Sequence, residues 1–253
     1  MATRATRATR ATIMVPRRLR ALGVAAALLA CGTVSTACAS GERPGAPRAQ
    51  PLTEAELMSV LPSGHDLQGY AATPRPPAPA PSPAAVPNAL APGSPAQCAD
   101  LVDFELDHGL RHRPAARVVA DVSPRGGPSG GPPQRRFRTL HSVSLASHTV
   151  GEASAVMDSL RKAVPLCGTF VAYTLAYGGQ DARIRVGALP APAAGDEAVS
   201  FDWTVEGNAM DETVPLTVVR TGGVIAVYSG AVPAGIPQGQ HRRLRAFLSG
   251  SPG

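Results

Sequence analysis

Two adjacent carboxylates, Asp196 and Glu197, follow Gly195 and are the acidic pair with the clearest potential for chemistry. One interpretation is a loop at which the two acids contact a ligand or a cation. The alternative, which we favour, is a turn in which Asp196 bonds its own backbone before a strand begins. Successive strand residues point to opposite faces, so the pair is poorly arranged for joint acid/base catalysis.

Two aromatic side chains offer a second candidate site. Phe201 and Trp203 are two residues apart within a predicted strand, which places them on the same side of it. We favour a role for both in the hydrophobic core. If the protein binds an apolar or carbohydrate ligand, these residues are the first candidates to contact it.

Motifs for catalysis, metals and cofactors are missing from the sequence. There is no G-x-S-x-G nucleophile motif, and no glycine loop has the strand–helix context of a phosphate site. His108 and His112 would share a helix face, as zinc ligands can, but Gly109 and Pro114 disfavour that helix. The sequence therefore predicts no catalytic residue, no metal site and no cofactor.

Residues 1–30 have the pattern of a secretory signal peptide. Three arginines precede an apolar run of ten residues, Ala21–Ala30. That run is too short for a membrane-spanning helix, which needs about 20 residues. Residues 1–13 consist largely of a repeated Ala-Thr-Arg triplet, and Met14 is the start that we favour.

Cys31 follows the apolar run directly, in the sequence Leu28-Leu29-Ala30-Cys31. This resembles the lipobox of bacterial lipoproteins, in which the cysteine is diacylated on sulfur and becomes the mature N-terminus. Two acyl chains suffice for stable membrane anchoring. Cys38 is the alternative, although it lacks the aliphatic residue three positions before it. A plain secreted protein and a weak membrane anchor over residues 21–39 are further interpretations, and each places the body outside the cell.

The other two cysteines, Cys98 and Cys167, would pair in an oxidising exterior. Closing a loop of about 70 residues stabilises a fold by about 4 kcal/mol in the chain-entropy model. Neither cysteine belongs to a C-x-x-C motif, which gives redox catalysis and zinc binding little support. The alternative is a pair of buried free thiols.

Charge is distributed unevenly along the 253 residues, of which 44% are apolar. The net charge is +6, from 24 basic and 18 acidic residues. Residues 1–30 contain six of the arginines and no acid, which leaves 18 basic and 18 acidic residues in the remainder. The basic character thus belongs to the leader, and we expect no nucleic-acid partner.

Proline and glycine divide the rest of the chain. Residues 31–51 are predicted to be a tether and residues 52–72 a short helical segment. Residues 73–95, with nine prolines among 23 residues, are a linker or an insertion. Residues 96–249 have the pattern of a folded domain, and we expect segment 52–72 to dock onto it.

Apolar spacing predicts the elements of this domain. Residues 149–165 have the periodicity of an amphipathic helix that Thr149 and Glu152 cap, and Thr221-Gly222-Gly223 predicts a tight hairpin. Residues 117–121 form a short apolar run, strands are expected over residues 135–145, 170–177, 182–188, 198–205, 214–220 and 224–229, and a closing helix is expected over residues 240–248. The prediction is an α+β fold, a central antiparallel sheet with helices packed on one face.

Several phrases of the sequence resemble one family. They are Gly69-Tyr70, the run from Ser142 through Leu160 to Gly168, Gly195–Phe201 and Val218–Val227. Together they are similar to the PknH-like extracellular sensor domains of actinobacteria, which occur on receptor kinases and as stand-alone lipoproteins. The resemblance implies a sheet flanked by helices, a cleft for an unidentified ligand and no catalytic residue. Members near the kinases tend to have two disulfides, whereas this domain can form one.

These observations predict a cell-surface lipoprotein that is held in the membrane by its N-terminal lipid. Its sensor-like domain would be non-enzymatic and bind a small extracellular ligand or an envelope protein. An envelope hydrolase or wall-modifying enzyme on the same anchor is the alternative. A structural accessory of another membrane protein is a third hypothesis.

Overall fold

The computed structural model describes most of the chain after residue 49. All described residues belong to one compact unit, residues 43–253. The leader, both candidate lipidation sites and nearly all of the tether lie outside the described residues. No helix in the described part is long and apolar enough to cross a membrane. The described residues are 50–62, 67, 69–76, 89–105, 112–125, 141–174, 180–206 and 212–250.

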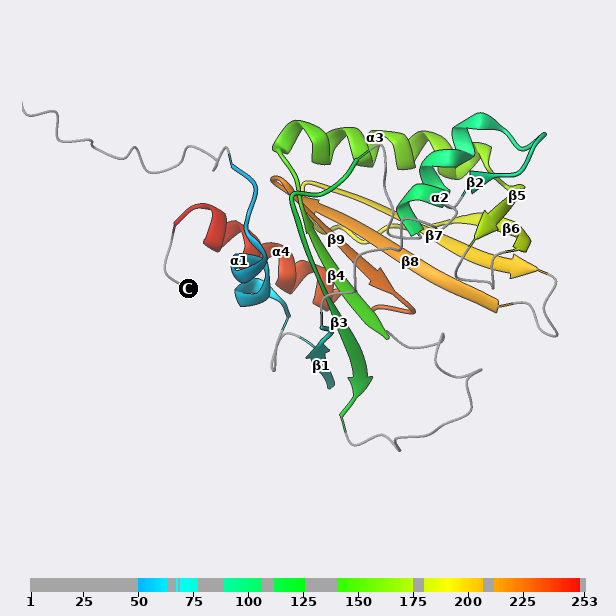
Figure 1. Cartoon of the computed structure of the whole chain (residues 1–253). Coiled ribbons are helices and arrows are strands. Elements are labelled where there is room, and N and C mark those ends of the chain that lie inside the picture. The colour runs from blue at the N-terminus through cyan, green and yellow to red at the C-terminus, as the bar shows by residue number, and fades with distance from the viewer. Residues whose placement is uncertain are drawn as a thin grey trace, which may run out of the picture. The chain divides into compact units, whose positions relative to one another are not determined.

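A single sheet of nine strands forms the centre of the described structure, and every neighbouring pair is antiparallel (Figure 1). The α+β class and the central antiparallel sheet are therefore confirmed. In spatial order the strands are β1 (Tyr70–Pro74), β3 (Ala116–Pro124), β4 (Ser142–Ser147), β9 (Val224–Ser229), β8 (Glu212–Thr221), β7 (Glu197–Glu206), β6 (Gln180–Leu189), β5 (Thr169–Thr174) and β2 (Ala89–Leu90).

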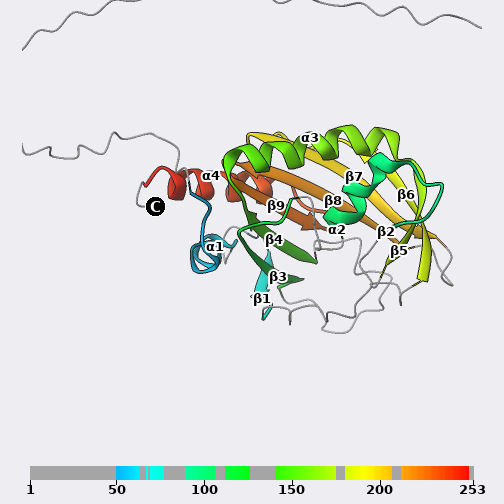
Figure 2. The same cartoon turned by 45° about the horizontal axis from the view of Figure 1, so that its top comes forward.

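Within the described residues, helices α1, α2, α3 and α4 and the 3-10 helix η2 accompany this sheet. Figure 2 shows the longest helix, α3, lying along the sheet with α2 beside it. The remaining two, α1 and α4, contact each other and the strands around β3, β4 and β8. The helices are α1 (Glu54–Val60), the 3-10 helix η2 (Ala96–Cys98), α2 (Ala99–Glu105), α3 (Val150–Leu166) and α4 (Gly235–Leu248).

The central strands β8 and β9 are covered on both faces, whereas the sequence predicted helices on one face of the sheet. In β8, Val218 belongs to the core beneath α2 and α3, whereas its neighbour Val219 belongs to the core beneath α1 and α4. In β9, Ile225 belongs to the core beneath α2 and α3, and Val224 belongs to the core beneath α1 and α4. Successive strand residues point to opposite faces, so these central strands need apolar cover on both sides.

The short N-terminal segment, which contains α1, completes the core on the α1 and α4 side of the sheet. Leu57 is fully buried there, and Leu52 donates its backbone N–H to Ser147 Oγ at 2.6 Å. Helix α4 holds the other end of α1, because Gln240 Nε2 donates to the carbonyl of Val60 at 2.8 Å. Although it precedes the proline-rich stretch, the segment is thus an integral part of the domain.

The structure describes parts of the proline-rich stretch, residues 73–95, near both of its ends, and each of these parts contributes to the sheet. Thr73 and Pro74 are in β1, and the Arg75 N–H donates to the carbonyl of Val119 at 2.7 Å. Ala89 and Leu90 form β2 at the opposite edge. Strands β1 and β2 are therefore the two edge strands of the sheet, and residues 77–88 lie outside the described part.

Local signals set the helix ends. Thr149 accepts from the Glu152 N–H while Glu152 accepts from the Thr149 N–H, the capping box that the sequence predicted for α3. Helix α4 begins at Gly235, five residues before the predicted start. Pro237 lies in its first turn, where the missing N–H costs no helical hydrogen bond.

The β8–β9 hairpin should be intolerant of a larger residue at its second turn position. A Cβ on Gly223 would collide with the backbone carbonyl oxygen of His148, whose own N–H donates to the Gly223 carbonyl. We expect Gly223→Ala to lower the free energy of unfolding in urea by about 1–3 kcal/mol, since the strand–hairpin contact must open.

Gly151→Ala is the matched control for this prediction. A Cβ on Gly151, in the first turn of α3, meets nothing within 4 Å. This variant should leave stability unchanged or raise it by up to about 1 kcal/mol. Equal losses in the two variants would contradict the close approach at Gly223.

Candidate functional site

Cys98 and Cys167 form the disulfide that the sequence predicted. Their Cα atoms are 5.6 Å apart and both side chains are fully buried. Cys98 ends η2, and Cys167 is the C-cap of α3. The bond therefore fixes the start of α2 against the C-terminal end of α3, although 69 residues separate the two in sequence.

The aromatic candidates Phe201 and Trp203 lie in the core beneath α3. They are 0% and 1% exposed, and the ring of Trp203 makes an edge contact with Phe170 at a centroid distance of 5.9 Å. A ligand platform must be accessible, and both rings are covered. Their burial favours the core role, and ligand binding at these two residues stays a prediction.

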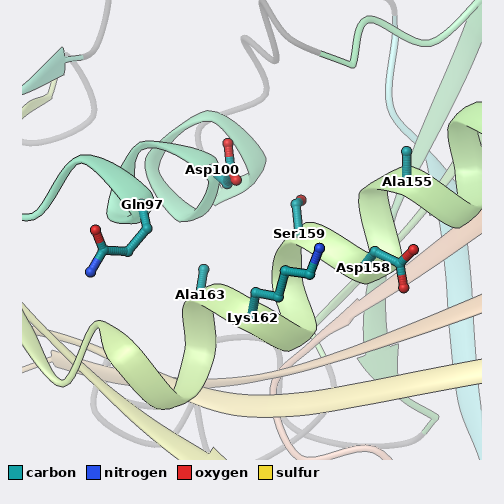
Figure 3. Close-up of a pocket in the computed structure, with 7 residues that line it drawn as sticks. All are labelled: Gln97, Asp100, Ala155, Asp158, Ser159, Lys162 and Ala163. Carbon is teal, nitrogen blue, oxygen red and sulfur yellow. The ribbon is translucent and has the colours of Figure 1, made fainter. Parts of the chain in front are cut away.

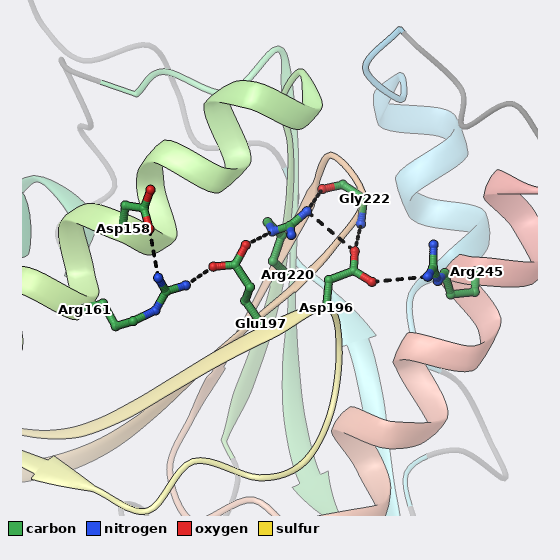
Figure 4. A network of polar contacts seen from close by, with 7 residues as sticks. All are labelled: Asp158, Arg161, Asp196, Glu197, Arg220, Gly222 and Arg245. Atoms are coloured by element: carbon green, nitrogen blue, oxygen red, sulfur yellow. Dashed lines mark hydrogen bonds and ion pairs between the residues drawn. The ribbon is translucent and has the colours of Figure 1, made fainter.

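The acidic candidates Asp196 and Glu197 meet Arg220 at the end of the sheet (Figure 4). Glu197 Oε1 accepts from Arg220 Nε at 2.6 Å, and Asp196 Oδ2 lies 3.5 Å from Arg220 Nη1. Asp196 Oδ2 also accepts the backbone N–H of Gly222 at 2.7 Å. The sequence suggested that Asp196 would bond its own turn, but its partner is the hairpin 26 residues away.

Two further arginines extend this cluster to the helices. On α3, Arg161 pairs with Glu197 and with Asp158, the latter at 2.8 Å. On α4, Arg245 Nη2 lies 3.4 Å from Asp196 Oδ1. We call this set of three acids and three arginines the sheet-end network; its members are Asp158, Arg161, Asp196, Glu197, Arg220 and Arg245.

Backbone packing explains the glycine that precedes the two acids. Gly195 has a φ of +77°, and a Cβ there would collide with the Arg220 carbonyl oxygen and a Val219 methyl. The Asp196 N–H donates to that same carbonyl at 2.8 Å. The glycine and the acids together join β7 to the β8–β9 hairpin. Both carboxylates are bonded to Arg220, and Asp196 also to the Gly222 amide, which favours a structural role. Ligand contact by Asp196 and Glu197 stays a prediction.

The histidines that the structure describes do not gather into a metal centre. His241 Nδ1 lies 2.9 Å from Thr221 Oγ1, but Thr221 is 1% exposed. Burial lowers the pKa of both His148 and His241, so the neutral imidazole is favoured. Within the described ranges, no three His, Cys, Asp or Glu side chains come together in a group that could hold a metal ion. His108 lies outside those ranges.

A pocket of about 360 Å³ opens between α2 and α3 (Figure 3). We call it the α2–α3 pocket. One wall comes from η2 and α2 and the other from α3, whose residues at three- and four-residue spacing share one helix face. Its lining residues are Gln97, Asp100, Ala155, Asp158, Ser159, Lys162 and Ala163.

Lys162 is the residue of this pocket that sequence reasoning missed. It is the single lysine of the chain, whose other 23 basic Lys or Arg residues are arginines. That rarity was visible in the sequence, but the pocket was not. The pocket forms only when α2 and α3 lie side by side, and that contact depends on tertiary packing and the disulfide.

Comparison with models of known protein families finds no match, and comparison with curated proteins finds no significant similarity. The resemblance to PknH-like sensor domains therefore stays a prediction.

The sheet-end network should contribute measurably to stability through Arg220. Its side chain is 14% exposed and faces the carboxylates of Glu197 and Asp196. Arg220→Met keeps much of the apolar stem but leaves two partly buried acids with fewer donors. We expect the free energy of unfolding in urea to fall by about 1–3 kcal/mol.

Arg75→Met is the matched control on an exposed pair. Arg75 and Asp121 bond each other with side chains 52% and 59% exposed, and this hydrogen bonding lowers the pKa of Asp121. Exposed pairs contribute about 0–1 kcal/mol, so the loss should be within that range. If Arg220→Met costs no more than Arg75→Met, the network has no structural role.

Proposed function

We propose that this protein is a lipoprotein of the outer face of the cell membrane. Its α+β domain would be a non-enzymatic sensor that binds an extracellular ligand or an envelope partner. In this proposal Cys31 carries the lipid, with Cys38 as the alternative, and residues 31–51 connect the membrane to the domain.

The disulfide is the observation that carries this proposal. Cys98 and Cys167 bridge two helices in the domain core, and such bonds persist in oxidising compartments outside the cytosol. The leader independently predicts export, since a basic stretch and a short apolar run precede Cys31. A protein exported by that leader would meet the conditions that the disulfide needs.

The α2–α3 pocket supports ligand binding as the role of the domain. Its volume of about 360 Å³ lies within the range of about 300–1,000 Å³ that is typical of small-molecule sites. Charged and polar side chains line it around two alanine methyl groups. For the envelope hydrolase, the Thr221 hydroxyl beside the His241 imidazole is buried, which disfavours it as a nucleophile.

The intact mass of the protein from the membrane fraction of an actinobacterial host tests the anchor and the disulfide together. We expect cleavage before Cys31, addition of a diacylglyceryl group, and a gain of two hydrogens per molecule on reduction. Cys31→Ser should abolish the lipid mass and release the protein from the membrane, whereas Cys38→Ser should change neither.

Other masses would overturn the proposal or redirect it. An unmodified full-length mass that reductant does not change would place the protein inside the cell and end the lipoprotein hypothesis. Loss of the lipid in Cys38→Ser alone would move the anchor to Cys38. Cross-linking on intact cells then separates a small-molecule sensor from an accessory that is bound to another membrane protein.

A further inference from the structure

The α2–α3 pocket presents charges of opposite sign within one small space. Asp158 and Lys162 are four residues apart on α3, and Asp100 contributes a second carboxylate from α2. Figure 3 shows the Lys162 side chain extended along α3 toward Ser159 and Asp158. A purely anionic ligand would be repelled by the acids, and a purely cationic one by the lysine.

The Lys162 ammonium is available to a ligand. It makes no hydrogen bond or ion pair with any residue that the structure describes, and its side chain is exposed. An ammonium group has three donors and no acceptor, so the complementary ligand group is a carboxylate or another anion.

Asp158 keeps capacity for a cationic group. Its Oδ1 accepts from Arg161 Nη1 at 2.8 Å, and Arg161 is also held by Glu197 in the sheet-end network. A carboxylate has about four acceptor positions on two oxygens, so the Arg161 contact leaves Oδ2 for an ammonium group. Between the charges, the methyl groups of Ala155 and Ala163 offer apolar contact.

The walls of the pocket are held in place before any ligand arrives. Gln97 directly precedes Cys98, and the disulfide ties this wall to the end of α3. Preorganisation of this kind lowers the ordering cost of binding. The pocket also lies on the face of the sheet opposite α1 and α4.

We propose that the α2–α3 pocket binds a small zwitterion, a free amino acid or a dipeptide, with its carboxylate at Lys162 and its ammonium group at Asp158. This inference deepens the proposed function by naming the ligand class of the sensor, and as a sensing role it rests on that function. The pocket volume of about 360 Å³ accommodates a ligand of this size.

Isothermal titration calorimetry on the purified, oxidised full-length protein at pH 7 tests the assignment. The probes are L-alanine, L-glutamate, L-lysine and L-alanyl-L-alanine, with acetate and methylamine as single-charge controls. We expect at least one zwitterion to bind and both controls to fail. Lys162→Gln and Asp158→Asn should each raise the Kd by tenfold or more.

Arg75→Gln, on the exposed β1–β3 ion pair, is the matched control and should leave the Kd unchanged. Both test residues are exposed, so circular dichroism and thermal unfolding should match those of the unmodified protein. Absence of binding by all four zwitterions would overturn the proposal. So would binding that ignores both substitutions, or acetate binding that depends on Lys162 alone.

This experiment and the mass measurement fail independently. Calorimetry uses purified protein and needs no lipid, so zwitterion binding could hold in a protein that proves not to be anchored. A confirmed anchor with no zwitterion binding would leave the surface lipoprotein standing and remove this ligand class.

Discussion

The central strands β8 and β9 carry apolar side chains on both faces, and the rest of the domain is fitted to that constraint. Val218 and Ile225 need one cover, and Val219 and Val224 need another. Helices α2 and α3 supply the first, and α1 and α4 supply the second. Because α1 precedes the proline-rich stretch and α4 ends the domain, the hydrophobic requirement of one hairpin brings distant parts of the chain together.

Polar and covalent links then fix the helices that burial has placed. The sheet-end network joins α3, the β8–β9 hairpin and α4 through alternating acids and arginines, while the disulfide joins η2 to the C-terminal end of α3. Helix α3 is thus held at its C-terminal cap and along its middle, and one wall of the α2–α3 pocket inherits that rigidity. The same arginine that pairs with Asp158 in the pocket also reaches Glu197 in the network.

Much of the architecture could be predicted because its signals are local. The capping box of α3, the two-glycine hairpin and the placement of Phe201 and Trp203 on one side of β7 depend on residues a few positions apart. The cover on both faces could not be assigned in this way, because it depends on which strands become central. Likewise, the sequence offered Asp196 a local turn, whereas the folded chain gives it a hairpin amide 26 residues away.

The sequence by itself determined the α+β class and the pairing of Cys98 with Cys167. It also predicts an exported, lipid-anchored chain. Composition, short-range periodicity and cysteine count are properties of the chain before it folds. The tertiary structure alone decided that Phe201 and Trp203 are covered, that Asp196 and Glu197 are engaged by arginines, and that α2 faces Lys162 and Asp158 across a pocket. Exposure, ion pairing and concavity arise where segments far apart in sequence meet, and no local pattern encodes which segments those are.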